Sequence, residues 1–240
     1  MGPSPPRLSA ARAGAPENGE FTFVRAVYSS PLRGYGGYGG SWAVDFPEAD
    51  YHFISGMRDW TGINLSISAE PKQLPIMDER LFRYPLIYFV EPGFLELSNE
   101  EAARLREYIQ RGGFVFLDDF WGEAEWQNVR EQLKKVLPEY EIKDLPLSHP
   151  IFHCYLDIDE VVQVPGIHSW VYRGVTHEKG GIVPHYMGIE DASGRLVVLI
   201  TRNNDLGDAW EWINSPSYPA KFGLVAYKIG VNAVVYAMTH

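Results

Sequence analysis

Hydrophobic and polar positions along the chain alternate between patterns typical of strands and patterns typical of helices. Apolar runs rich in β-branched and aromatic residues predict strands, and apolar residues three and four positions apart predict helices. The strands are expected at residues 21–28, 63–68, 86–90, 114–118, 161–164, 182–189 and 196–201. The helices are expected at residues 47–60, between Ser98 and Gly112, at 126–136 and at 220–239.

This alternation through residue 137 predicts an α/β fold with a mostly parallel central sheet and helices on both faces. The runs 86–90, 114–118 and 196–201 are apolar throughout, so we expect them at the centre of the sheet. Residues 21–240 are expected to form a single domain. Residues 1–20 contain many Pro and Gly without hydrophobic periodicity, and we interpret them as a disordered leader or a processed remnant.

Composition narrows the classes of function. The 240 residues carry a formal net charge of -10, which disfavours binding to nucleic acid or to an anionic membrane. Cys154 is the single cysteine, so an internal disulfide and a multi-cysteine zinc site are excluded. No apolar run approaches the roughly 20 residues of a transmembrane segment. Residues 1–20 also lack the apolar stretch of a secretory signal.

Polar residues at the ends of the predicted strands are candidates for a site, because parallel α/β sheets bind ligands outside the carboxyl ends of their strands. Asp118 and Asp119 follow one buried strand. Adjacent strand residues point to opposite faces. The pair is explained either by a turn and a helix cap, or by a carboxylate that binds a polar ligand or a cation.

A second polar group, Arg202 and Asn203, stands at the end of the 196–201 strand. It is suited either to holding a carboxylate or sugar hydroxyls, or to forming an Asx-rich turn. The ligand-binding candidates are therefore Asp118, Asp119, Arg202 and Asn203, with Trp42 and Trp121 as apolar walls.

His149 and His153 have the spacing that places two imidazoles on one face of a helix. Pro150, however, biases His149 away from helical dihedral angles. We therefore expect histidines that form structural hydrogen bonds, no metal site and no cofactor. Cys154 lies in an apolar stretch and is interpreted as a buried small hydrophobe.

Several segments together resemble the bacterial domain of unknown function 4159. They read FVRAVY at 23–28, WAVDFPEAD at 42–50, LFRYP at 81–85, LSNEE at 97–101, RGGFVFLDD at 111–119, HPIFH at 149–153 and GVNAVVYAMT at 230–239. The resemblance implies a flavodoxin-like α/β sandwich similar to class I glutamine amidotransferases. It also implies an exported or periplasmic protein associated with the cell envelope.

Class I amidotransferases carry a nucleophilic cysteine on a Gly-x-Cys-x-Gly turn, after the strand that corresponds here to 114–118. This chain has Asp118-Asp119-Phe120-Trp121-Gly122 instead. A carboxylate is a poor replacement for a thiolate, so we expect no glutaminase activity.

Two functions of different class remain. We favour a binding or assembly module, whose partner is a small polar ligand or an envelope protein. The alternative is a hydrolase acting on a carbohydrate or an amide. Asp119 would then be the general base or nucleophile, with His149 or His153 as the acid.

Overall fold

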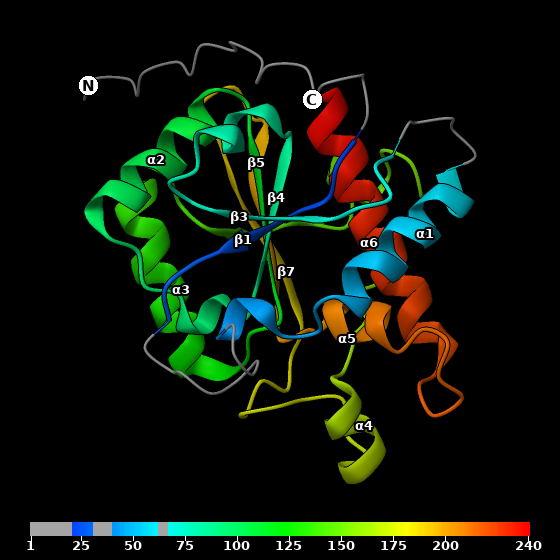
Figure 1. Cartoon of the computed structure of the whole chain (residues 1–240). Helices are drawn as coiled ribbons and strands as arrows, with labels where there is room; N and C mark the ends of the chain where they lie inside the picture. The colour runs from blue at the N-terminus through cyan, green and yellow to red at the C-terminus, as the bar shows by residue number, and fades with distance from the viewer. Residues whose placement is uncertain (1–20, 31–39, 62–66) are drawn as a thin grey trace.

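The computed structural model describes residues 21–30, 40–61 and 67–240. Its centre is a seven-stranded sheet in the order β3-β1-β4-β5-β8-β7-β6 (Figure 1). The strands are β1 (Val24–Val27), β3 (Lys72–Pro75), β4 (Leu86–Val90), β5 (Phe114–Asp118), β6 (Lys143–Asp144), β7 (His185–Glu190) and β8 (Leu196–Arg202). The pairs from β3 across to β8 are parallel, and β7 is antiparallel to both β8 and β6. The sheet is therefore mostly parallel, as predicted.

Helices cover both faces of this sheet (Figure 1). One face carries α2 (Asn99–Gln110) and α3 (Gly122–Val136), and the other carries α1 (Glu48–Thr61), α5 (Leu206–Glu211) and α6 (Ala220–Thr239). A further helix, α4 (Ile167–Arg173), projects away from the sheet. Short 3₁₀ turns in the connections are η3 (Ser41–Ala43), η4 (Glu79–Arg83), η5 (Pro92–Phe94) and η6 (Pro150–Phe152).

Alternate residues of the central strands face the two helix layers. In β4, Leu86, Tyr88 and Val90 belong to the core beneath α1, α5 and α6. Ile87 and Phe89 belong to the core beneath α2 and α3. All of these side chains are buried, because a central strand of a covered parallel sheet has no exposed face. The predicted central placement of 86–90, 114–118 and 196–201 is confirmed.

Local signals set the ends of the helices. Ser98 Oγ accepts a hydrogen bond from the Glu101 amide at 3.1 Å, and Glu101 Oε2 accepts one from the Ser98 amide at 2.9 Å. This reciprocal cap begins α2, and Gly112, with a φ of 101°, follows its end. The predicted closing helix at 220–239 is confirmed as α6.

The strand expected at residues 161–164 is wrong, because no strand occurs there. The Val164 amide donates to Asn204 Oδ1 at 2.9 Å, and the Val164 carbonyl accepts from the Asp205 amide at 3.0 Å. The β8–α5 connection thus satisfies these backbone groups, and a sheet ladder is not needed.

Other differences have equally local causes. The strand expected at 182–189 begins at His185, directly after Pro184, which has no N–H to donate. β3 was not expected, because it is polar and only Leu74 in it is buried, as suits an edge strand. Of the strand expected at 63–68, residues 63–66 lie outside the described residues, as do residues 1–20.

α6 is the one helix in the described ranges that is long and apolar enough to cross a membrane, with a mean hydropathy of 1.3. Inside this protein, 61% of that stretch is buried. Such burial is typical of a helix in a protein core. The described residues therefore hold no clear transmembrane segment.

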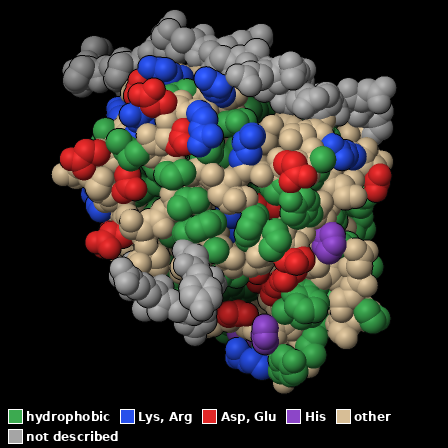
Figure 2. All heavy atoms as spheres, viewed as in Figure 1, with side chains coloured by type: hydrophobic (Ala, Val, Ile, Leu, Met, Phe, Trp, Pro, Cys, Tyr) green, Lys and Arg blue, Asp and Glu red, His purple; other side chains and the backbone are tan. Residues whose placement is uncertain are grey.

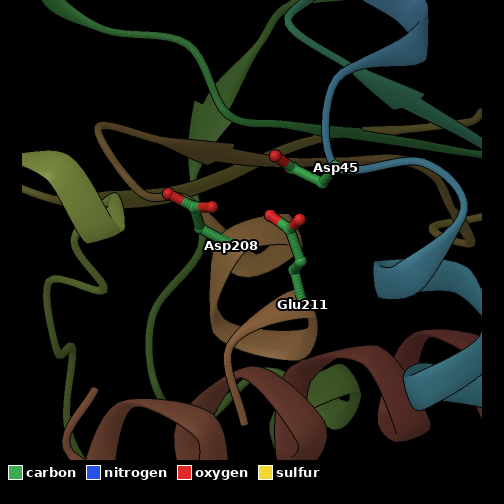
Figure 3. Close-up of side chains that lie close together, drawn as sticks. All are labelled: Asp45, Asp208 and Glu211. Carbon is green, nitrogen blue, oxygen red and sulfur yellow. The ribbon is translucent and has the colours of Figure 1, made fainter. Parts of the chain in front are cut away.

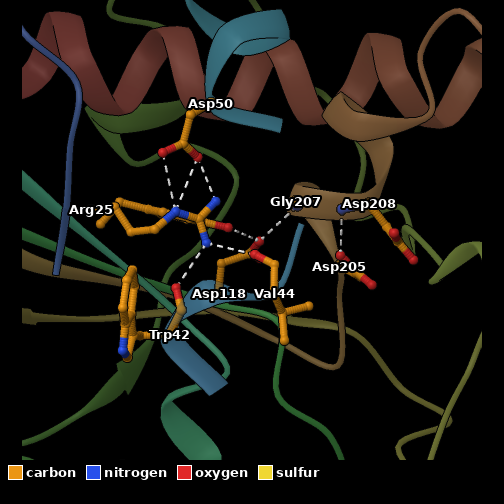
Figure 4. A network of polar contacts seen from close by, with 9 residues as sticks. Arg25, Trp42, Val44, Asp50, Asp118, Asp205, Gly207 and Asp208 are labelled. Atoms are coloured by element: carbon orange, nitrogen blue, oxygen red, sulfur yellow. Dashed lines mark hydrogen bonds and ion pairs between the residues drawn. The ribbon is translucent and has the colours of Figure 1, made fainter. Parts of the chain in front are cut away.

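A buried ion pair joins β1 to α1. Arg25 and Asp50 are both fully buried, and Arg25 Nε lies 3.1 Å from each carboxylate oxygen of Asp50. Arg25 Nη1 donates to the carbonyl oxygens of Val44 at 2.8 Å and Trp42 at 3.2 Å (Figure 4). Arg25 therefore fixes the chain between η3 and α1 as well as α1 itself.

Replacing Asp50 by Asn is expected to lower the free energy of unfolding by about 3–5 kcal/mol, because it leaves a buried guanidinium without its counter-charge. Urea unfolding at pH 7 measures this change. Glu107→Gln is the matched control, since Glu107 pairs with Arg111 on the exposed surface of α2 and is expected to change stability by less than about 1 kcal/mol. Equal unfolding midpoints for the two variants would contradict the assigned role of the buried pair.

Candidate functional site

Three polar residues turn the chain at the carboxyl ends of the central strands. Glu91 follows β4, Asp119 follows β5 and Asn203 follows β8. Their φ angles are 47°, 56° and 58°, in the left-handed region that residues other than glycine rarely adopt. Each such residue costs roughly 1–3 kcal/mol, and such residues concentrate at functional sites.

Asp118, the last residue of β5, is fully buried and binds groups from three elements. Its Oδ1 accepts from the Thr201 hydroxyl at 2.6 Å, and its Oδ2 accepts from the Tyr88 hydroxyl at 2.9 Å. The same Oδ2 accepts from the amides of Leu206 at 2.9 Å and Gly207 at 3.3 Å, at the start of α5 (Figure 4). Asp118 thus connects β4, β5, β8 and α5, and its oxygens are already occupied by protein donors.

Asp119 has a different environment. It is 7% exposed, and its Oδ1 accepts from Trp121 Nε1 at 3.0 Å. It does not cap α3, because the residue before that helix is Trp121, and the amide of Gly122 at the start of the helix donates to Asn203 instead. Trp121 is itself buried, so it orients the Asp119 carboxylate and is not an open wall of a cleft.

Asp119 belongs to a group of acidic side chains that we call the carboxylate cluster: Asp45, Glu91, Asp119, Asp205, Asp208 and Glu211. Oxygens of Asp45, Asp119 and Asp205 lie within 4.8 Å of one another. The same holds for Asp45, Asp208 and Glu211, whose side chains converge in Figure 3. Asp45 is common to both groups.

Part of this cluster comes together because Asp205, Asp208 and Glu211 follow one another at intervals of three residues. Asp205 precedes α5, where its Oδ1 accepts from the Asp208 amide at 2.7 Å, and Asp208 and Glu211 lie within the helix. Residues three apart lie on the same face of a helix, so these carboxyls share one side of α5. Asp45, with a φ of 60°, approaches from the segment before α1.

Burial is the main cause of the shifted pKa values in the cluster. It raises the pKa of Asp45, Asp119 and Asp205 well above their usual range, and neighbouring carboxylates raise these values further. Burial also raises the pKa of Glu91 and of Glu211 to about 7.

Two oxygens in the cluster are buried without a hydrogen-bond partner: Asp45 Oδ2 and Glu91 Oε2. The neighbouring cations are engaged elsewhere. Arg25 is paired with Asp50, and Lys179 Nζ is 2.6 Å from Glu125 Oε1. When ionised, the carboxylate cluster therefore carries more negative charge than Arg25 and Lys179 offset.

Oxygen-only ligand sets of this kind suit hard cations such as Ca²⁺, Mg²⁺ and Mn²⁺. The two groups of carboxylates centred on Asp45 could each hold one metal ion. No metal site was expected from the sequence, because its single cysteine and the His149 and His153 pair make a poor ligand set. Asp45, Glu91, Asp208 and Glu211 were missed as site residues. The sequence feature that could have revealed Asp208 and Glu211 is their spacing of three residues from Asp205 and from each other.

The other ligand-binding candidates lie outside the cluster. Arg202 Nη2 is 3.0 Å from Glu123 Oε2, and the Arg202 guanidinium lies 4.9 Å from the centre of the Trp126 ring, over α3. Asn203 Oδ1 accepts from the Gly122 amide at 2.9 Å, so Asn203 links β8 to α3. Trp42 is half-buried, and its carbonyl oxygen binds Arg25.

The two histidines do not converge with Asp119. His149 Nε2 is 3.5 Å from Glu190 at the end of β7, and Glu190 pairs with Leu196, the first residue of β8. It therefore lies at the end of the sheet opposite Asp119. His153 Nδ1 is 2.9 Å from Asp157 on the surface. Neither of these two described histidines therefore lies beside Asp119, as the hydrolase alternative requires.

Figure 2 shows acidic and basic side chains mixed over the upper half of this face, and acidic side chains near α5 in the lower half with histidine and basic side chains around them. The formal net charge of -10 favours the approach of a cationic ligand over an anionic one.

Without divalent cations, the protein is expected to lose stability as the pH rises from about 4.5 to about 7. The pKa of Glu91 is raised in the folded state from its ordinary 4.5 to about 7, so between these values the folded state holds a proton that the unfolded state has released. The stabilisation is complete below pH 4.5 and is lost as the pH rises through about 7.

Thermal unfolding in a chelator at pH 5, 6, 7 and 8 measures this effect. Burial lowers the pKa of His149, which acts in the opposite direction near its ordinary 6.5. The decisive quantity is therefore the difference between the wild type and Glu91→Gln, whose Tm is expected to fall less across this range. A variant with the same pH dependence as the wild type would contradict the assignment.

Asp118→Asn is expected to lower the free energy of unfolding by about 1–3 kcal/mol, because an amide group would face hydrogen-bond donors. Asp119→Asn is expected to change it little, since its oxygen can still accept from Trp121 and Asn tolerates a left-handed conformation. Urea unfolding of the two variants at pH 7 tests the contrast, and equal losses would refute it.

Comparison with known proteins is consistent with the segments that carry the sequence resemblance. The family model described as "Domain of unknown function (DUF4159)" matches residues 22–238. A search of curated proteins found no match. Since the match covers almost the whole chain, the protein belongs to the DUF4159 family.

Proposed function

We propose that this protein is a ligand-binding module that takes a positively charged ligand at the carboxylate cluster. The observation that carries the proposal is the convergence of Asp45, Asp119 and Asp205, from three separate segments, within 4.8 Å. Like charges brought together in a buried site repel one another, and a bound cation offsets that repulsion.

The fold supports this placement. Numbered along the chain, the parallel strands β3, β1, β4, β5 and β8 follow the order 2-1-3-4-5 of flavodoxin-like sheets. This order supports the expected likeness to class I amidotransferases. In such sheets ligands bind at the carboxyl ends of the strands, where Glu91 and Asp119 lie.

The chemistry supports binding more than catalysis. The amidotransferase resemblance implies a nucleophilic cysteine at the position of Asp118 and Asp119, and neither His149 nor His153 lies beside Asp119. Location in the periplasm, or export to the envelope, is part of the proposal and rests on the sequence resemblance. An envelope protein that presents a cationic group is compatible with the same site.

Thermal unfolding in the presence of cations tests the proposal. CaCl₂, MgCl₂, MnCl₂ and spermidine are compared at pH 7.5 with NaCl of equal ionic strength. A ligand present at 100 times its Kd stabilises the folded state by about 2.7 kcal/mol. That corresponds to a rise in Tm of roughly 5–10 °C for a chain of this size.

Asp45→Asn is expected to abolish the rise, because Asp45 belongs to both carboxylate groups. Glu107→Gln removes an acidic group from the exposed surface of α2 and is expected to respond as the wild type does. The proposal fails if no cation raises the Tm beyond the NaCl control, or if Asp45→Asn responds like the wild type.

A further inference from the structure

We infer that the carboxylate cluster is a binuclear centre for hard divalent cations, with Asp45 as the ligand shared by two ions. This inference rests on the proposed cation-binding function and specifies its ligand. One ion would be held by Asp45, Asp119 and Asp205, and the other by Asp45, Asp208 and Glu211.

The dimensions of each group suit one ion. Ca²⁺ binds oxygen at about 2.3–2.6 Å, so ligands on opposite sides of one Ca²⁺ are roughly 4.6–5.2 Å apart. The oxygens of each group lie within 4.8 Å of one another, which allows all three to contact the same Ca²⁺. Mg²⁺, at about 2.0–2.1 Å from each ligand, needs oxygens that lie within roughly 4.2 Å of one another.

A shared Asp45 explains why two groups meet at this point. When all five carboxyls in the two groups are ionised, they carry more charge than a single divalent ion can offset, whereas two ions offset most of it. Protein sites with two metal ions typically separate them by about 3.5–4 Å, a distance that one carboxylate can bridge with its two oxygens. Figure 3 shows Asp45 extending toward α5, from which Asp208 and Glu211 project.

Unpartnered buried oxygens are independent evidence for a ligand. Asp45 Oδ2 is buried without a hydrogen-bond partner in a protein where Asp118 satisfies its own buried oxygens fully. Glu91 is 8% exposed, and its Oε2 is also unpartnered. Buried polar atoms without partners are rare and call for an explanation, such as an ion.

The backbone around the cluster favours a compact ion over an organic cation. A Cβ on Gly207 would lie 2.3 Å from Asp45 Oδ2, and a Cβ on Gly166 would lie 3.0 Å from Asp205 Oδ2 and 3.2 Å from Asp208 Oδ2. Glycine backbone therefore lies directly against these oxygens and leaves little room for a carbon chain. The cavity of about 550 Å³ lies elsewhere, between α1 and α6, and is lined by Trp60 and Tyr227 among others.

The stoichiometry of binding by the full chain tests the inference. Calorimetric titration with CaCl₂ is expected to give two ions per chain. Titration with MnCl₂, followed by electron paramagnetic resonance, is expected to give a spin-coupled spectrum at two equivalents. The wild-type measurements alone decide the number of ions, whether or not a variant folds.

Variants assign the ions to the two groups. Asp45→Asn is expected to weaken binding of both ions at least tenfold, while Asp119→Asn and Glu211→Gln each remove a different ion and abolish the coupled spectrum. Glu107→Gln, on the exposed surface of α2, is expected to bind two ions as the wild type does. Circular dichroism confirms that each variant is folded.

The outcomes separate this inference from the function on which it rests. One ion per chain, or loss of the same ion in Asp119→Asn and Glu211→Gln, overturns the binuclear centre and leaves cation binding intact. Stabilisation by spermidine without binding of Ca²⁺ or Mn²⁺ also overturns the inference alone. If neither metal ions nor spermidine bind, the proposed function fails and the inference fails with it.

Discussion

The buried pair of Arg25 and Asp50 is the interaction on which the rest of the site depends. Burying two charges is costly, and the arrangement is stable only when the donors and acceptors are satisfied. Arg25 meets this requirement with the Asp50 carboxylate and with the carbonyl oxygens of Trp42 and Val44. Because Val44 directly precedes Asp45, the same guanidinium that joins β1 to α1 also helps to position Asp45, whose carboxylate lies near Asp208 and Glu211 of α5.

The carboxylate cluster opposes the stability that this pair supports. Glu91, Asp119 and Asp45 adopt left-handed backbone conformations, and their carboxyls lie near one another, buried for Glu91 and Asp119 and half-buried for Asp45. Each of these features is unfavourable for folding in the absence of a ligand. Most natural sequences avoid such combinations except where function requires them. Glu91 and Asp119 stand at the carboxyl ends of β4 and β5, while the central strands themselves are packed with apolar side chains.

Sequence patterns predicted the elements whose side chains are uniformly buried or strongly periodic. The central strands and α6 were found as expected, because burial on both faces leaves a continuous apolar run and a long helix leaves a clear period. β3 and α5 were missed. β3 is a polar edge strand, and α5 has only six residues. The cluster could not be predicted in full, since Asp45 reaches α5 only through contacts distant in sequence.

The two adjacent aspartates after β5 show how one motif serves two purposes. Asp118 is the last residue of the strand, and its oxygens accept from Thr201, Tyr88 and the start of α5. Asp119 follows in a left-handed conformation, which turns its carboxylate toward Asp45 and Asp205. The sequence left open whether this pair was structural or functional. The contacts assign the structural role to Asp118, because a carboxylate saturated by protein donors has little capacity left for a ligand. Asp119 is the candidate for ligand binding, because the side-chain hydrogen bond described for its carboxylate is the one from Trp121.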